Sequence, residues 1–123
     1  MDKIIGTGVA LVTPFNSDHS IDFDALKKLI NYVIDGGVEY LVLLGTTAES
    51  ATLSSSEKIQ IVNYCKEINK NRIPIVLGIG GNNTSNVIKQ IKMFDLDGIE
   101  AILSVCPYYN KPSQMGIYNH YAE

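Results

Sequence analysis

Short apolar runs alternate along the chain with longer stretches in which apolar residues recur every three to four positions. The short runs cover residues 9–12, 40–44, 75–77 and 101–105. Continuous apolar runs of this length are typical of strands that are buried on both faces. The longer stretches have the spacing of one helix face, as in Leu26, Leu29, Ile30 and Val33. We therefore expect the order β-α-β-α-β-α-β-α.

Capping residues mark the ends of the predicted helices. Asp22 precedes the first helix, where a carboxylate suits the positive end of the helix dipole, and Gly36-Gly37 ends it. Ser54 and Glu57 have the spacing of a capping box at the start of the second helix. Thr84 is the expected N-cap of the third helix.

Two architectures suit this order, because apolar strands separated by amphipathic helices form a parallel sheet with right-handed crossovers. One is an open α/β sheet. The other is half of a TIM (β/α)₈ barrel, with about four βα units in one domain of residues 1–123.

The glycine cluster at 78–83 does not match a nucleotide-binding fingerprint, so we expect a tight turn with positive φ. The third helix is predicted to end at Asp97-Gly98, and the fourth to begin at Ser113.

Composition narrows the possible functions. The 123 residues are 46% hydrophobic and 19% charged, which excludes intrinsic disorder. A net charge of −3 argues against nucleic acid as a partner, and no apolar stretch approaches the ~20 residues that span a membrane. Residues 1–6 lack the pattern of a signal peptide, so a cytoplasmic protein is expected. Cys65 and Cys106 are expected to be two buried thiols, and no metal site or cofactor is predicted.

Candidate chemistry lies in two loops after strands, because parallel α/β folds place function at the carboxyl ends of strands. In residues 45–50, Thr46 and Thr47 offer hydroxyls that either bind a carboxylate and relay a proton or cap local backbone groups. In residues 107–112, Tyr108 and Tyr109 suit either acid-base chemistry or a subunit interface.

Other chemically active side chains are less promising. His19 is predicted to lie in a solvated turn and His120 to be structural, so no catalytic triad is indicated. Lys111 lies on a polar loop, where nothing would lower the pKa of its amine as a nucleophile requires.

Three motifs together resemble the dihydrodipicolinate synthase family, also called 4-hydroxy-tetrahydrodipicolinate synthases. They are residues 10–15 (Ala-Leu-Val-Thr-Pro-Phe), 45–50 (Gly-Thr-Thr-Ala-Glu-Ser) and 107–112 (Pro-Tyr-Tyr-Asn-Lys-Pro). The resemblance implies a (β/α)₈ barrel of which this chain is the N-terminal half. It also implies an enzyme of lysine (diaminopimelate) biosynthesis that condenses pyruvate with aspartate-4-semialdehyde through a Schiff base with a barrel lysine.

The same resemblance implies roles for individual residues. Thr46 would link two tyrosines in a proton relay, and Thr47 would bind the pyruvate carboxylate. Tyr109 would be the relay tyrosine that each subunit supplies to its neighbour across a tight dimer interface, within a tetramer. Tyr108 would lie at that interface, near an allosteric lysine pocket whose other positions here are Ser50, Ala51 and Asn82.

The sequence departs from the family pattern in three ways. Ala48 replaces the usual glycine, and we expect the loop to tolerate it. Asn86 stands where regulated members resemble one another in having a glutamate, which argues against lysine feedback. The second relay tyrosine, an arginine and the Schiff-base lysine have no counterpart up to Glu123, so this chain alone is expected to be inactive.

Two alternatives remain open at this point. A non-catalytic half-barrel fragment or scaffold would self-associate to cover its open strand edges. An N-acetylneuraminate lyase or a keto-deoxy sugar acid aldolase would share the scaffold, although those proteins usually have Gly-Ser-Thr in place of the Gly-Thr-Thr at residues 45–47.

Overall fold

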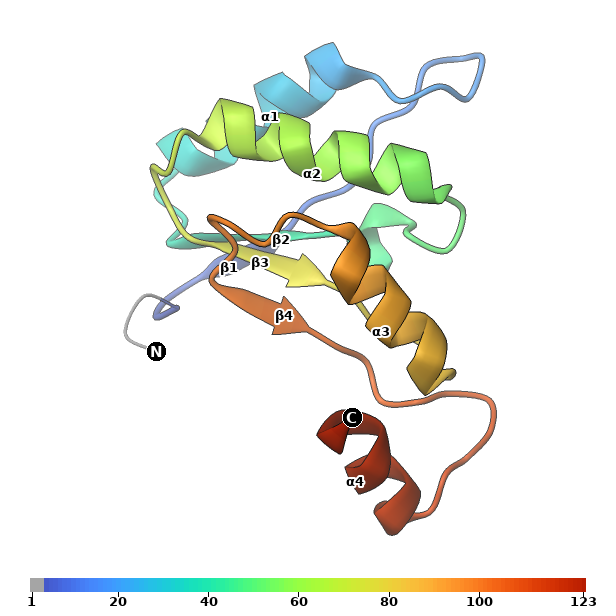
Figure 1. Cartoon of the computed structure of the whole chain (residues 1–123). Coiled ribbons are helices and arrows are strands. Elements are labelled where there is room, and N and C mark those ends of the chain that lie inside the picture. Colours follow the sequence, from blue (N-terminus) through green and yellow to red (C-terminus); the bar gives the residue numbers. More distant parts are fainter. Residues whose placement is uncertain (1–3) are drawn as a thin grey trace.

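The computed structural model describes residues 4–123. The start of the segment without a signal-peptide pattern, residues 1–3, lies outside the described residues. Helices and strands alternate in the predicted order (Figure 1). The strands are β1 (Gly8–Ala10), β2 (Tyr40–Leu43), β3 (Ile75–Gly78) and β4 (Ala101–Leu103). The helices are α1 (Phe23–Asp35), η1 (Thr46–Ala48), α2 (Ser55–Asn69), α3 (Thr84–Met93) and α4 (Gln114–Ala122).

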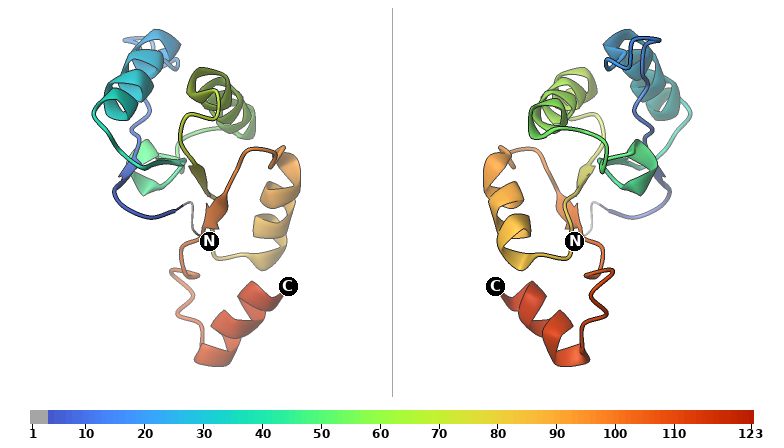
Figure 2. Two further views of the ribbon diagram at one scale, coloured as in Figure 1. Left: turned by 90° about the vertical axis from the view of Figure 1, so that its left-hand side faces the viewer. Right: turned by 90° about the vertical axis from the view of Figure 1, so that its right-hand side faces the viewer.

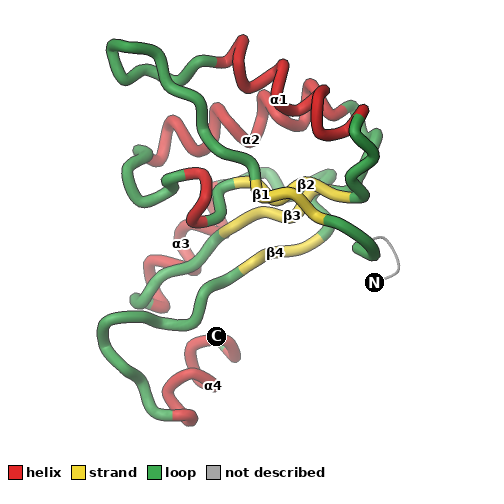
Figure 3. The backbone as a smooth tube through the Cα atoms, turned by 180° about the vertical axis from the view of Figure 1, so that it is seen from behind, coloured by secondary structure: helices red, strands yellow, loops and turns green. Residues whose placement is uncertain are grey.

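The four strands form one parallel sheet in the order β1-β2-β3-β4, with Gly8 opposite Tyr40 at one edge (Figure 3). Helices α1, α2 and α3 follow one another around one side of this sheet, and α4 lies beyond β4 (Figure 2). Each strand therefore pairs with the strand that precedes it in sequence, and each of the first three crossovers packs on the same side. No helix among residues 4–123 combines the length and the apolar character needed to cross a bilayer.

The core lies between the central strands and the helices that cover them. Its most deeply buried side chains come from β2, β3, α1 and α2: Leu26, Ile30, Leu41, Leu43, Val62, Cys65, Ile75 and Leu77. These positions match the apolar residues from which the elements were predicted. Burial of this aliphatic surface is the main favourable contribution to folding.

The prediction that all four apolar runs are buried on both faces is correct for β3 and wrong for the outer strands. All of residues Ile75–Leu77 are buried, whereas Val12 after β1 and Leu103 in β4 are about half exposed. The reason is position: β1 and β4 are the edges of the sheet, and among the described residues no second layer covers the side of the sheet opposite α1 and α2.

Several predicted helix ends are confirmed by hydrogen bonds. The Asp22 carboxylate accepts from the N–H of Ala25 at the start of α1, and Gly37 takes a φ of 87° after its end. At α2 both halves of the capping box are present: Ser54 Oγ accepts from the Glu57 N–H, and Glu57 Oε2 accepts from the Ser54 N–H.

The predicted limits of α3 are wrong at both ends. Asn83, and not Thr84, is the N-cap, because its side chain accepts from the Asn86 N–H. The helix ends at Met93, four residues before Asp97-Gly98, since Phe94 is already extended with ψ at 143°. The intervening residues form a turn in which the Asp95 carboxylate accepts from Lys66 Nζ at 2.8 Å.

Close approach, and not positive φ, explains the glycines after β3. Gly78, Gly80 and Gly81 all have negative φ, so the predicted left-handed turn is wrong. A Cβ at Gly78 would lie 2.5 Å from the Leu44 carbonyl oxygen, and one at Gly80 would lie 2.9 Å from the Val105 nitrogen. The glycines therefore let neighbouring backbone segments pack directly against β3.

The cysteine prediction is half right. Cys65 is buried in the core beneath α2, and this burial raises the pKa of its thiol to about 12. Cys106 is exposed, because it lies after the edge strand β4 and not under a helix. Among residues 4–123 no three His, Cys, Asp or Glu side chains gather as they would around a metal ion.

Candidate active site

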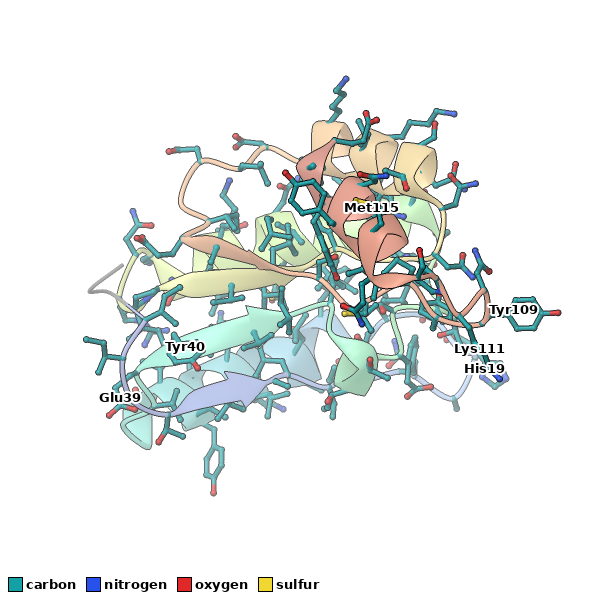
Figure 4. All side chains as sticks on the ribbon, turned by 90° about the horizontal axis from the view of Figure 1, so that it is seen from below. His19, Glu39, Tyr40, Tyr109, Lys111 and Met115 are labelled. Atoms are coloured by element: carbon teal, nitrogen blue, oxygen red, sulfur yellow. The ribbon has the colours of Figure 1, made fainter. Side chains whose placement is uncertain are left out.

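The loops that follow the strands gather at one end of the sheet. These loops are residues 13–22 after β1, 46–50 after β2, 79–83 after β3 and 104–113 after β4. Figure 4 shows His19, Tyr109 and Lys111 together at this end, and Glu39 and Tyr40 at the opposite end of the strands. The candidate chemistry from both loops therefore lies on one rim, as parallel strands require.

The turn after β2 is a short 3-10 helix, η1, over Thr46–Ala48. Gly45 is extended, with a φ of −68° and a ψ of −177°, and the left-handed φ of 53° falls on Leu44 before it. Ala48 is buried with negative φ, and Glu49 takes the left-handed conformation after it. Position 48 therefore does not need the access to positive φ that glycine offers, which supports the prediction that the loop tolerates alanine there.

Thr46 and Thr47 are exposed on this turn. Neither hydroxyl forms a hydrogen bond with any of residues 4–123, so the interpretation in which they cap local backbone groups is wrong. The turn is closed instead by backbone bonds, from the Ala48 N–H to the Gly45 carbonyl at 3.1 Å and from the Glu49 N–H to the Thr46 carbonyl at 3.0 Å. Both hydroxyls are thus free to donate to a ligand.

A buried hydroxyl that sequence reasoning missed supports the turn from β1. Thr13 Oγ donates to the Ala48 carbonyl oxygen at 2.8 Å. Thr13 stands in the first of the three motifs, between Val12 and Pro14. Only the fold shows that its polar side chain is buried.

The loop after β4 is held against the segment after β3 by two amide side chains. Asn82 Nδ2 donates to the Tyr108 carbonyl at 3.1 Å, and Asn110 Nδ2 donates to the Asn82 carbonyl at 3.2 Å. Tyr109 stands out from this loop with a φ of 69° and is 92% exposed (Figure 4). Within residues 4–123 no hydrogen bond joins Tyr109 to Thr46.

A cavity of about 710 Å³ opens between these loops, the first turn of α2 and one side of α3. It brings together the four residues that the resemblance placed around a regulatory pocket, namely Ser50, Ala51, Asn82 and Tyr108. Asn86 lines the same cavity. Lys58, one turn into α2, also lines it and was missed, because the sequence shows it only as one more polar residue of an amphipathic helix.

The remaining candidates are placed as predicted. His19 is exposed in its turn, and His120 Nδ1 lies 2.8 Å from Thr84 Oγ, which joins α4 to α3. Lys111 is exposed on its loop. Partial burial raises the pKa of Tyr121 on α4, and a hydrogen bond with Cys106 adds to that shift.

Comparison with known sequences identifies relatives over nearly the full chain. The profile of the dihydrodipicolinate synthetase family matches residues 3–123. The 4-hydroxy-tetrahydrodipicolinate synthase of Karelsulcia muelleri is 62% identical over 98% of the chain, and that of Flavobacterium psychrophilum is 60% identical over the same share. The match covers 41% of each of these two relatives, so the chain spans about two fifths of their length.

Solved structures give the same result for the fold. The 4-hydroxy-tetrahydrodipicolinate synthase of Methylacidiphilum fumariolicum is 40% identical and superposes with a TM-score of 0.91, over 98% of this chain and 40% of that one. The chloride-inhibited synthase of Acinetobacter baumannii, solved in complex with pyruvate, is 41% identical with a TM-score of 0.90, over 94% and 40%. The four βα units are therefore those of a half barrel, and the chain belongs to the dihydrodipicolinate synthetase family.

Proposed function

We propose that the complete protein is a lyase of lysine (diaminopimelate) biosynthesis that condenses pyruvate with aspartate-4-semialdehyde in the cytoplasm. Residues 1–123 would form the N-terminal half of its barrel domain. The observation that carries this proposal is the pair of free hydroxyls, Thr46 and Thr47, on the turn of a chain 62% identical to a named synthase. That name favours the synthase over a scaffold or a sugar acid aldolase, and the pyruvate bound to the Acinetobacter relative favours an enzyme over a scaffold.

In the proposed reaction a lysine amine from the rest of the barrel attacks the ketone carbon of pyruvate and water leaves, which forms the Schiff base. The Thr47 hydroxyl donates to the pyruvate carboxylate and holds the ketone toward that amine. The Thr46 hydroxyl accepts one proton and donates another, so it passes protons between tyrosines on either side of it. Residues 4–123 offer no lysine in a desolvated position on the rim, so we propose that this part of the barrel is inactive alone.

The exposed position of Tyr109 supports a tight dimer in which each subunit supplies this tyrosine to the other. Its ring is almost free of contacts within its own chain, while two amide hydrogen bonds fix the loop that carries it. A rigid loop with an outward aromatic side chain suits an interface. Two such dimers would make the proposed tetramer.

The test uses the complete protein with pyruvate and aspartate-4-semialdehyde, with N-acetylneuraminate and 2-keto-3-deoxygluconate as competing substrates. Borohydride reduction in the presence of pyruvate should give one covalent adduct. Peptide mass mapping should place that adduct on a lysine outside residues 1–123. Thr47→Val should raise the KM for pyruvate, and Thr47→Ser, which keeps the hydroxyl, is the matched control. Cleavage of a sugar acid without condensation, or no adduct, would refute the proposal.

We also propose that lysine is a weak inhibitor or none. The cavity that holds Ser50, Ala51, Asn82 and Tyr108 has no carboxylate at position 86. Of the charged residues that line it, Glu49 is exposed to solvent and Lys58 adds a positive charge to its wall. An ammonium group in this cavity would meet that like charge without a partner at Asn86. Millimolar lysine should leave the rate unchanged in the wild type, and inhibition should appear in Asn86→Glu combined with Lys58→Gln. Strong inhibition of the wild type would contradict this.

A further inference from the structure

Thr13 is one of two buried polar residues among residues 4–123, and its side chain is only 7% exposed. Its hydroxyl donates one hydrogen bond, of 2.8 Å, to the carbonyl oxygen of Ala48. Ala48 lies 35 positions later in the sequence. A buried hydroxyl is costly to desolvate unless such a bond is made. The bond therefore ties the segment after β1 to the turn after β2.

Backbone hydrogen bonds on both sides of Thr13 hold this residue in place. Before it, the Leu11 N–H donates to the Val42 carbonyl at 3.0 Å, which continues the pairing of β1 with β2. After it, the Pro14 carbonyl accepts from the Asp22 N–H at 2.9 Å. Thr13 is thus fixed relative to the sheet before its side chain reaches the turn.

The turn transmits this constraint to the two free hydroxyls. Ala48 is the last residue of η1, its N–H is bonded to Gly45, and the next N–H, of Glu49, is bonded to Thr46. A unit closed by two such bonds moves as one body, so a fixed Ala48 carbonyl also fixes where Thr46 and Thr47 point.

We propose that Thr13 is a positioning residue for the pyruvate-binding turn, which acts through the Ala48 carbonyl and does not touch substrate. This inference rests on the proposed function, because it assigns a purpose to a geometry that Thr47 is proposed to use. Without the hydroxyl, the buried carbonyl has no donor and the turn shifts to find one in water. A displacement of about 1 Å is enough to lower catalytic efficiency about 100-fold.

The experiment compares Thr13→Val, which keeps the shape and loses the donor, with Thr13→Ser, which keeps the donor, in the complete protein. Thr13→Val should lower kcat/KM for pyruvate by about 10-fold to 100-fold, mainly through KM, while Thr13→Ser should stay within about 3-fold of the wild type. Thr84→Val, which removes another threonine hydroxyl with a 2.8 Å hydrogen bond, should lower stability without raising that KM. An unchanged KM in Thr13→Val, or an equal loss in Thr13→Ser, would overturn the proposal.

A second readout separates this inference from the proposed activity. Amide hydrogen exchange at Glu49 reports whether η1 is intact, because that N–H closes the turn on Thr46. Exchange there should be about 10-fold faster in Thr13→Val than in Thr13→Ser. If the wild type lacks synthase activity but this difference is present, the proposed function fails and the anchoring of the turn stands. Equal exchange in the two variants refutes the anchoring, whatever the activity.

Discussion

Replacing Gly78 by alanine tests whether the close contact between β3 and the end of β2 positions the candidate site. The added Cβ would lie 2.5 Å from the Leu44 carbonyl oxygen, 2.7 Å from the carbonyl carbon and 2.9 Å from the Gly45 nitrogen. All three atoms are backbone, so no side chain can rotate away. Ordinary contact begins at 3.4 Å, so the end of β2 must move by about 0.9 Å.

The expected loss of stability follows from two opposing effects. Overpacking of this kind typically costs about 1–3 kcal/mol, and rigid backbone on the far side of the contact favours the upper part of that range. Gly78 has negative φ, so alanine adds no conformational strain and gains about 0.4–1 kcal/mol from the unfolded chain. The net destabilisation is about 1–2 kcal/mol.

The functional effect should be larger than the loss of stability suggests. Leu44 and Gly45 lead directly into η1, so the displacement of about 0.9 Å passes to Thr46 and Thr47. Such a shift is expected to lower kcat/KM for pyruvate about 100-fold. Urea unfolding and steady-state kinetics of the complete protein measure the two effects. Gly81→Ala, whose Cβ would meet only Val87 at 3.4 Å, is the control for stability. A Gly78→Ala protein with wild-type unfolding and kcat/KM would refute the reasoning.

Two further predictions concern α2. Hydrogen bonds from the Ser54 hydroxyl and, to a smaller extent, from the Ser54 N–H hold the pKa of Glu57 below its ordinary value of 4.5. Their contribution to folding stability is therefore present above that pH and is lost as the pH falls through the lower pKa of the folded state. The gap in Tm between the wild type and Ser54→Ala should therefore be wide at pH 7 and close in acid, and a gap that is constant with pH would contradict the capping box. In a polypeptide of residues 1–123 at pH 8, iodoacetamide should alkylate Cys106 while Cys65, with a thiol pKa raised to about 12 by burial, reacts only in urea. Peptide mass mapping distinguishes the two, and rapid modification of Cys65 in the folded chain would show that the core is open.

Local patterns were sufficient to predict the elements of this fold. Each helix start depends on atoms within three or four residues, as at Asp22 and Ser54, so the sequence contains the whole interaction. The apolar periodicity of α1 and α2 likewise identified the buried residues of their inner faces. The error at α3 arose because Asn83 and Thr84 are both good N-caps, and the contact of Thr84 with His120, 36 positions away, is not visible locally.

Features that depend on distant segments were not predicted. The tight contact that demands glycine at position 78 involves the backbone of Leu44, and the Thr13 bond reaches Ala48 across a whole βα unit. The candidate threonines were found because they stand in a motif, whereas their freedom from local hydrogen bonds could only be seen in the structure. Lys58 was missed because helix periodicity marks which face is polar and not which polar residue borders a cavity.

The order of strands in the sheet has a consequence for synthesis on the ribosome. Tyr40 pairs with Gly8, Ile75 with Leu41, and Ala101 with Val76, so each new strand meets a partner that has already left the exit tunnel. At about 5–20 residues per second, the intervals between strands last seconds, whereas a helix forms within about a microsecond. The sheet can therefore grow vectorially, one βα unit at a time. Throughout this growth its newest strand is an uncovered apolar edge, which is the kind of surface that chaperones protect.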